Sequence, residues 1–131
     1  MRYRTIGSDA TQRSVSVLSL GAMLMGSRTD EATSFAILDR FAEAGGTFID
    51  TSGNYAFWVH GTQGGESEEL LGRWRRSRGI GDEIVIATKV GARPLAPAGG
   101  AWHVLVSGGW TCCTRTSRIL LCPCPRPSGV R

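Results

Sequence analysis

The 131-residue sequence predicts an α/β fold in which helices connect the strands of a parallel sheet. Two segments with helical spacing of their apolar residues alternate with three short apolar runs in the first hundred residues. The third run, IVIA, is continuously apolar, which is typical of a parallel strand that is covered on both faces. The resulting order of strand, helix, strand, helix, strand indicates parallel connections.

The N-terminal residues predict a short hairpin that leads into the sheet. Its strands are expected at residues 2–5 and 13–16, because both stretches alternate and the turn-forming residues SDATQ lie between them. The first strand of the sheet is expected near residues 17–20, and Gly21 ends it. The turn SLGAMLMG lacks the G-x-G-x-x-G spacing of dinucleotide-binding open sheets, so a barrel is the better prediction.

The first helix is predicted within SRTDEATSFAILDRFAEAGG. Thr29 or Asp30 can cap its N-terminus, and the pair Gly45-Gly46 supplies a C-terminal stop. Apolar residues at three- and four-residue spacing predict one buried face, namely Phe35, Leu38, Phe41 and Ala42. A second strand, Thr47–Asp50, is expected directly after this helix.

The second helix is predicted within ESEELLGRWRRSRG, after a long polar loop at residues 51–65. Ser67 can cap or start this helix. The residues expected to face the core are Leu70, Leu71 and Trp74. The residues expected to interact with the helix dipole are Glu66, Glu68 and Glu69. The residues expected on a solvated face, with acidic residues close by in the sequence, are Arg73, Arg75, Arg76 and Arg78. The third strand is then expected at Ile84–Ala87.

Two of the predicted strands run into ionisable side chains, Asp50 and Lys89. In a parallel barrel, side chains at the carboxyl ends of the strands face the same mouth. Tyr55 follows Asp50 closely and can fold back over that mouth. An ammonium beside a phenol stabilises the phenolate, and a carboxylate beside the ammonium holds its charge and position. The three residues therefore predict proton donation to a carbonyl oxygen while another group supplies hydride.

The segments that contain these residues, FIDTSGNYA, GGESEELLGRW and IVIATKVG, resemble the N-terminal third of the aldo/keto reductase family. The opening RYRTIG and the strand ending LGAM are similar to that family as well. The resemblance covers about residues 1–98. It implies a (β/α)8 TIM barrel, present here only in part, that reduces aldehydes or ketones with NADPH.

The resemblance also implies roles for individual residues. The family's catalytic Asp, Tyr and Lys fall on Asp50, Tyr55 and Lys89. Cofactor-binding positions beside the nicotinamide fall on Gly21, Ala22 and Met23, together with Asp50. The family's fourth catalytic residue is a histidine that ends the fourth strand, and neither His60 nor His103 stands at the matching place.

The C-terminal part of the chain differs in composition from the rest. Residues 1–100 carry 11 basic and 11 acidic residues, whereas residues 101–131 carry four arginines and no acid, so the whole net charge of +4 lies there. The same part holds all four cysteines, whose spacing is poor for zinc, so no metal site is predicted: Cys112, Cys113, Cys122 and Cys124.

We therefore expect a partial barrel domain at residues 1–98 and an irregular or disordered basic tail at residues 99–131. One hypothesis is that residues from about 101 onward were read in a shifted frame. With only three parallel strands and two helices, both edges of the sheet are expected to stay open.

Three functions are compatible with these features. The first is an NADPH-dependent reductase of a small carbonyl substrate. The second is an inactive fragment that lacks the catalytic histidine and the cofactor phosphate site. The third is a small binding module with a basic Cys-rich tail. No apolar run approaches the length of a membrane helix and no signal peptide is evident, so we expect a cytoplasmic protein without a membrane or nucleic-acid partner.

Overall fold

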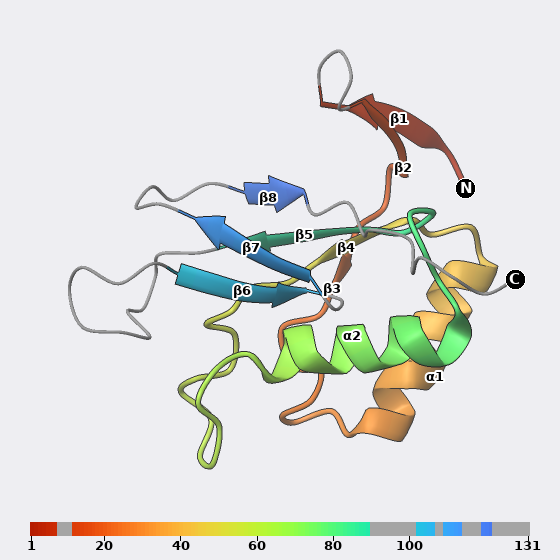
Figure 1. Ribbon diagram of the computed structural model, residues 1–131. Helices are drawn as coiled ribbons and strands as arrows, with labels where there is room; N and C mark the ends of the chain where they lie inside the picture. Colours follow the sequence, from red (N-terminus) through yellow and green to blue (C-terminus); the bar gives the residue numbers. More distant parts are fainter. Residues whose placement is uncertain (8–11, 90–101, 107–108, 114–118, 122–131) are drawn as a thin grey trace, which may run out of the picture.

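A small sheet forms the centre of the molecule, with its strands in the order β3-β4-β5-β8 (Figure 1). The computed structural model describes residues 1–7 and 12–89, together with the backbone of residues 102–106, 109–113 and 119–121. The three parallel strands are β3 (Leu20–Gly21), β4 (Phe48–Asp50) and β5 (Val85–Lys89). Their parallel pairing and the two helices between them confirm the predicted α/β arrangement.

Helix α1 (Glu31–Glu43) begins at the predicted cap and ends before the predicted glycines. The carboxylate of Asp30 accepts a hydrogen bond of 2.9 Å from the backbone amide of Thr33, which satisfies one of the free donors of the first turn. Gly45 follows the helix with a φ of +82°, in the left-handed region where a side chain is strained. Local sequence chemistry therefore fixes both ends of α1.

Helix α2 (Glu66–Arg78) is bounded by two glycines in left-handed conformation, Gly65 and Gly79. Gly65 occupies the capping position without a side-chain hydrogen bond, so the expectation that Ser67 caps the helix is wrong. The Glu66 carboxylate instead accepts a hydrogen bond of 2.6 Å from the backbone amide of Gln63, in the loop before the helix. The hydroxyl of Ser67 is buried and bonds instead to the turn after β3.

Both helices cover the same face of the sheet (Figure 1). Ile49 of β4 and Ile86 of β5 project into this core, and each is fully buried. The predicted core positions of the helices pack against them, fully or partly buried: Phe35, Leu38, Phe41, Ala42, Leu70, Leu71 and Trp74. Val85 and Ala87, which alternate with Ile86, are also buried, so the prediction that this strand is covered on both faces is confirmed.

The arginines of α2 do not all lie on a solvated face. Arg73 forms an exposed ion pair of 2.8 Å with Glu31 of α1, as expected of a surface residue. Arg75 is only 2% exposed and donates a hydrogen bond to the backbone carbonyl of Gly81, so the expectation is wrong for this residue. Arg75 stands four residues after Leu71, and this spacing places both on the core-facing side of the helix.

The N-terminal hairpin consists of β1 (Tyr3–Ile6) and β2 (Arg13–Ser16), close to the predicted ranges. It attaches to the sheet at the beginning of β4, where Ser16 and Thr47 exchange two hydrogen bonds. The Tyr3 hydroxyl adds a hydrogen bond of 3.0 Å to the carbonyl of Gly45. The hairpin therefore lies at the amino ends of the parallel strands.

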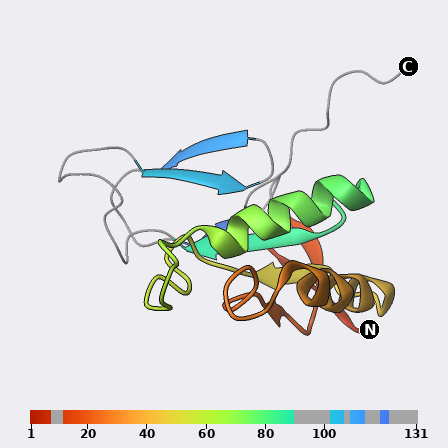
Figure 2. The ribbon, with the colours of Figure 1, turned by 90° about the horizontal axis from the view of Figure 1, so that it is seen from below.

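Three further strands lie in the C-terminal segment, for which the composition predicts an irregular tail. Strands β6 (Trp102–Val106) and β7 (Gly109–Cys113) pair as an antiparallel hairpin beside α2 (Figure 2). Strand β8 (Ile119–Leu121) pairs antiparallel with β5, so the expectation that both sheet edges stay open is wrong at this edge. The stretches WHVLV and GWTCC are rich in β-branched and aromatic residues, and this local preference prevails over the overall composition.

The described strands form an open sheet rather than a closed barrel, with β3 at one edge. The expected boundary at residues 98 and 99 lies outside the described residues, as do Cys122 and Cys124. Among the helices that are described, none is long and apolar enough to cross a lipid bilayer.

Candidate active site

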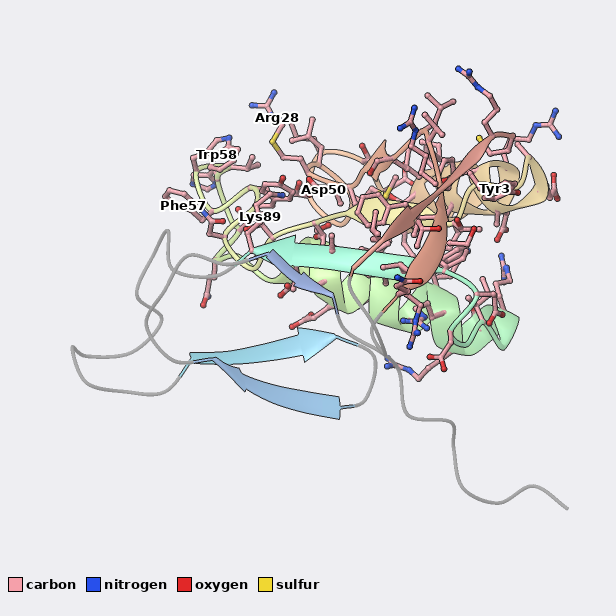
Figure 3. The ribbon with its side chains drawn as sticks, turned by 90° about the horizontal axis from the view of Figure 1, so that it is seen from above. Tyr3, Arg28, Asp50, Phe57, Trp58 and Lys89 are labelled. Carbon is pink, nitrogen blue, oxygen red and sulfur yellow. The ribbon has the colours of Figure 1, made fainter. Side chains whose placement is uncertain are left out.

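Asp50 and Lys89 lie at the carboxyl ends of the neighbouring strands β4 and β5. Asp50 pairs in register with Ala87, so Lys89, two residues further along, projects from the same face of the sheet. Figure 3 shows the two side chains together at this end, far from Tyr3 of the hairpin. The parallel register of two short strands therefore brings together residues that stand 39 positions apart in the chain.

Tyr55 completes a compact network with these two residues. The Lys89 ammonium lies 2.6 Å from Oδ1 and 2.7 Å from Oδ2 of Asp50. The same ammonium donates a hydrogen bond of 2.6 Å to the Tyr55 hydroxyl. That hydroxyl in turn donates a hydrogen bond of 2.8 Å to Oδ2 of Asp50. Each of the three predicted residues thus contacts both of the others.

A tight turn after β4 carries Tyr55 back over the strand ends. The backbone amide of Tyr55 donates to the carbonyl of Ser52 at 3.0 Å. The Ser52 hydroxyl lies 2.5 Å from Oδ1 of Asn54 and 3.3 Å from the carbonyl of Lys89, so the turn is held against the end of β5. Ala56 continues the turn with a φ of +61°. The polar residues of FIDTSGNYA therefore shape the backbone that positions the phenol.

The charge of Lys89 is stabilised by its neighbours. Burial disfavours the ammonium, but hydrogen bonds to Asp50 and Tyr55 and the charge of Asp50 outweigh this effect and raise the pKa of Lys89 above its ordinary value of 10.5. Lys89 is therefore positively charged at neutral pH, directly beside the phenol oxygen. The Lys89 and Asp50 side chains remain 41% and 36% exposed, so a small molecule can reach them.

The turn after β3 lies next to this network. Gly21 pairs in register with Asp50, and the backbone amide of Ala22 donates a hydrogen bond of 2.9 Å to the carbonyl of Asp50. A Cβ atom at Gly21 would meet no atom within 4 Å, so the space before this residue is open. Ala22 is buried and Met23 is 43% exposed. The turn after β3 therefore leaves open space beside the backbone of Asp50.

Comparison with known proteins shows the family of the chain. Residues 17–113 match the model of the Aldo/keto reductase family. The chain belongs to this family. Norsolorinic acid reductase B of Dothistroma septosporum is 43% identical over 96 residues, which cover 68% of this chain and 22% of the relative. Aldo-keto reductase ausK of Emericella nidulans is 40% identical over 97 residues, which cover 69% of this chain and 22% of the relative.

A third relative has a different length. The "Uncharacterized 11.2 kDa protein in crtE 3'region" of Pseudescherichia vulneris is 38% identical over 93 residues, which cover 70% of this chain and 88% of that protein. The aldo/keto reductase chain described here therefore spans about a fifth of the length of the norsolorinic acid reductases it matches, but most of the length of this small relative.

Sequence reasoning missed two residues of α2 that contact the strands behind this site. Ser67 is buried, and its hydroxyl donates a hydrogen bond of 2.7 Å to the carbonyl of Ala22. Glu68 is only 5% exposed, and its carboxylate accepts a hydrogen bond from the Thr88 hydroxyl. The sequence does contain a signal for their burial. They precede the predicted core residue Leu71 by four and three residues, and residues at this spacing share a helix face.

Burial changes the acid chemistry of Glu68. Removal from water raises the pKa of this carboxyl, and the hydrogen bond from Thr88 opposes the shift only in part. All three acids lie in the first turn of α2, as predicted, but Glu68 differs from Glu66 and Glu69 because it is buried. Its side chain lies behind the sheet, against Thr88, rather than at the Asp50–Tyr55–Lys89 network.

Aromatic side chains flank the open end of the site. The rings of Phe57 and Trp58 contact each other edge to face, with centroids 5.2 Å apart and planes at 82°. Figure 3 shows both at the same end of the sheet as Asp50 and Lys89. They are 39% and 55% exposed, respectively. Two exposed rings beside a polar network are suited to contact the apolar part of a ligand.

No histidine joins the network among the residues whose side chains are described. His60 lies in the polar loop between β4 and α2. His103 lies in β6, where only the backbone is described. The structure therefore brings together three of the four side-chain types that the resemblance implies.

Proposed function

We propose that the chain carries the proton-donating part of a carbonyl reductase active site. Tyr55 would donate its phenol proton to the oxygen of an aldehyde or ketone, while Lys89 and Asp50 assist it. The observation that carries the proposal is the position of the Lys89 ammonium, 2.6 Å from both the Tyr55 hydroxyl and Oδ1 of Asp50.

Contacts of the Lys89 ammonium support Tyr55 as the proton donor. The Lys89 ammonium hydrogen-bonds to the phenol oxygen, so it stabilises the negative charge left when the proton departs. Asp50 keeps the ammonium charged and in place through contacts with both of its carboxylate oxygens.

The phenol proton must be redirected before it reaches a substrate. The Tyr55 hydroxyl donates to Oδ2 of Asp50 at 2.8 Å. A carbonyl oxygen bound at the exposed side of Tyr55 would take the place of Asp50 as acceptor, and the Lys89 hydrogen bond to the phenol would persist. The proton then moves from Tyr55 to the carbonyl oxygen as the carbonyl carbon receives hydride, and an alcohol forms.

NADP(H) is the proposed hydride source. When bound, NADPH supplies the hydride for the carbonyl carbon. The residues that would hold its nicotinamide end are Gly21, Ala22 and Met23, together with Asp50. The open space at Gly21 and the backbone hydrogen bond between Ala22 and Asp50 support this assignment.

The proposed substrate is a small aldehyde or ketone with an apolar or aromatic substituent. Phe57 and Trp58 present exposed ring faces at the same end of the sheet as the network. Pairs of aromatic rings gain about 0.5–1.5 kcal/mol beyond the area they bury. An aromatic aldehyde is therefore the first substrate to test.

A binding titration followed by an activity assay tests this function. We expect NADPH fluorescence to change in a saturable way on addition of the chain, and NADPH to be consumed when an aromatic aldehyde is added. An absence of NADPH binding would contradict the proposal and favour the inactive fragment. Binding of zinc without binding of NADPH would favour the small binding module.

A further inference from the structure

The hydroxyl of Ser67 connects three elements behind the candidate active site. Ser67 lies in the first turn of α2 and is only 2% exposed. Its hydroxyl proton is donated to the carbonyl of Ala22, in the turn after β3, at 2.7 Å. The Thr51 hydroxyl oxygen lies 2.9 Å from the hydroxyl oxygen of Ser67. Because Ser67 has one hydroxyl proton and gives it to Ala22, Thr51 is the donor in this second bond.

Both hydrogen-bond partners of Ser67, Thr51 and Ala22, lie directly beside the backbone of Asp50. Thr51 follows Asp50 directly in the chain, and its own carbonyl accepts a hydrogen bond of 3.1 Å from the Lys89 ammonium. Ala22 lies across the sheet, where its amide donates to the carbonyl of Asp50 at 2.9 Å. The Ser67 hydroxyl therefore connects the residue after Asp50 in the chain to the turn that hydrogen-bonds to Asp50 across the sheet.

We propose that Ser67 is a positioning residue that fixes Asp50, and through it the Lys89 ammonium, relative to the turn at Ala22. The catalytic meaning of this role rests on the proposed reductase function. The physical basis is independent of it. Removal of this buried hydroxyl takes one hydrogen bond from the Thr51 hydroxyl and one from the Ala22 carbonyl, which then keeps only its bond from the Met25 amide.

Ser16 provides a matched control at the opposite end of the sheet. It is also 2% exposed, its hydroxyl donates to the carbonyl of Leu18 at 2.7 Å, and it accepts from the amide of Thr47 at 3.0 Å. A Ser16→Ala variant therefore also loses one donated and one accepted hydrogen bond at equal burial. The two variants differ in which strand end they loosen.

Lys89 provides the readout, because it is the only lysine in the chain. Incorporation of lysine labelled at the ε carbon gives a single side-chain NMR signal, whose titration reports the pKa of Lys89 without any cofactor or substrate. In the wild-type chain we expect a pKa above the ordinary value of 10.5.

We expect Ser67→Ala to lower the pKa of Lys89 toward its ordinary value, because Asp50 is no longer held against the ammonium. Ser67→Thr, which keeps the hydroxyl, should restore the wild-type value, and Ser16→Ala should leave it unchanged. Thr51→Val removes the donor to Ser67 at nearly constant volume and should act like Ser67→Ala, which provides a second route if the first variant does not fold.

An unchanged pKa of Lys89 in both Ser67→Ala and Thr51→Val would overturn the positioning role. An equal decrease in Ser67→Ala and Ser16→Ala would also overturn it, because general loosening of the fold would then explain the effect. A chain that shows the expected NMR pattern but binds no NADPH would contradict the reductase function and leave the positioning role intact.

Discussion

The Lys89 ammonium makes two contacts with Tyr55. It donates a hydrogen bond of 2.6 Å to the Tyr55 hydroxyl, and it lies 4.7 Å from the centroid of the Tyr55 ring in a cation–π contact. Both contacts place positive charge where a phenolate would form. Tyr55 comes from the loop after β4 and Lys89 from the end of β5, so their contact depends on the fold rather than on nearness in the chain.

Replacement of Tyr55 by Phe tests the proton donor directly. If the chain has the proposed activity, we expect Tyr55→Phe to reduce it by roughly 10²- to 10⁴-fold, the usual contribution of general acid catalysis. The measurement is NADPH consumption with an aromatic aldehyde. Tyr3→Phe is the control, because Tyr3 lies in the hairpin at the other end and loses only a hydrogen bond to Gly45. Equal loss in both variants would contradict the role of Tyr55.

Lys89 makes stability sensitive to alkaline pH. Its pKa is raised in the folded protein, so its contribution is fully present below the ordinary value of 10.5 and is lost as the pH rises through the folded-state pKa. We expect Lys89→Met to show a smaller loss of unfolding free energy between neutral and strongly alkaline pH than the wild type. Urea unfolding at a series of pH values measures this difference. Identical pH profiles would show that Lys89 does not contribute.

Unlike Lys89, Glu68 destabilises the fold when its side chain is charged. Because burial raises its pKa, its contribution is most favourable below the ordinary value of 4.5 and is lost as the pH rises through the folded-state pKa. We expect Glu68→Gln to unfold at higher urea concentration than the wild type at neutral pH, and to lose this advantage in acid. Glu69→Gln alters the exposed neighbour and serves as the control. A Glu68→Gln variant that is less stable at neutral pH would contradict this account.

The Asp39 carboxylate of α1 is linked to α2 by a hydrogen bond from the buried indole of Trp74. This carboxylate accepts a hydrogen bond of 2.8 Å from Nε1 of Trp74, whose side chain is fully buried, and a second of 2.8 Å from Arg78. We expect Asp39→Ala to lower the unfolding free energy by about 1–3 kcal/mol, because the indole donor loses its partner. Chemical denaturation monitored by tryptophan fluorescence measures the loss.

Glu43→Ala is the matched control for Asp39→Ala. Glu43 pairs with Arg40 on the same helix, but their side chains are 67% and 83% exposed. Exposed pairs of this kind contribute about 0–1 kcal/mol. A loss in Asp39→Ala no larger than that in Glu43→Ala would show that the indole hydrogen bond contributes little.

The sequence by itself determined much of the local structure in the described part of residues 12–89. The cap at Asp30, the glycine after α1 and the three- and four-residue spacing of apolar residues each act over one or two helical turns, so they can be read without a structure. The same local signals explain the agreement at the core positions of α2. The motif FIDTSGNYA also predicts Asp50 and Tyr55 as site residues.

Only the tertiary structure decided which side chains meet and which charges are buried. Spacing within α2 does not reveal that Ser67 reaches Ala22 in the turn after β3, 45 residues away, or that Glu68 reaches Thr88 of β5, 20 residues away. Strand β8 likewise pairs with β5 across a long separation, although the composition of its segment predicts irregular structure. Such contacts depend on the register of the sheet and on helix packing against it, which no local pattern specifies.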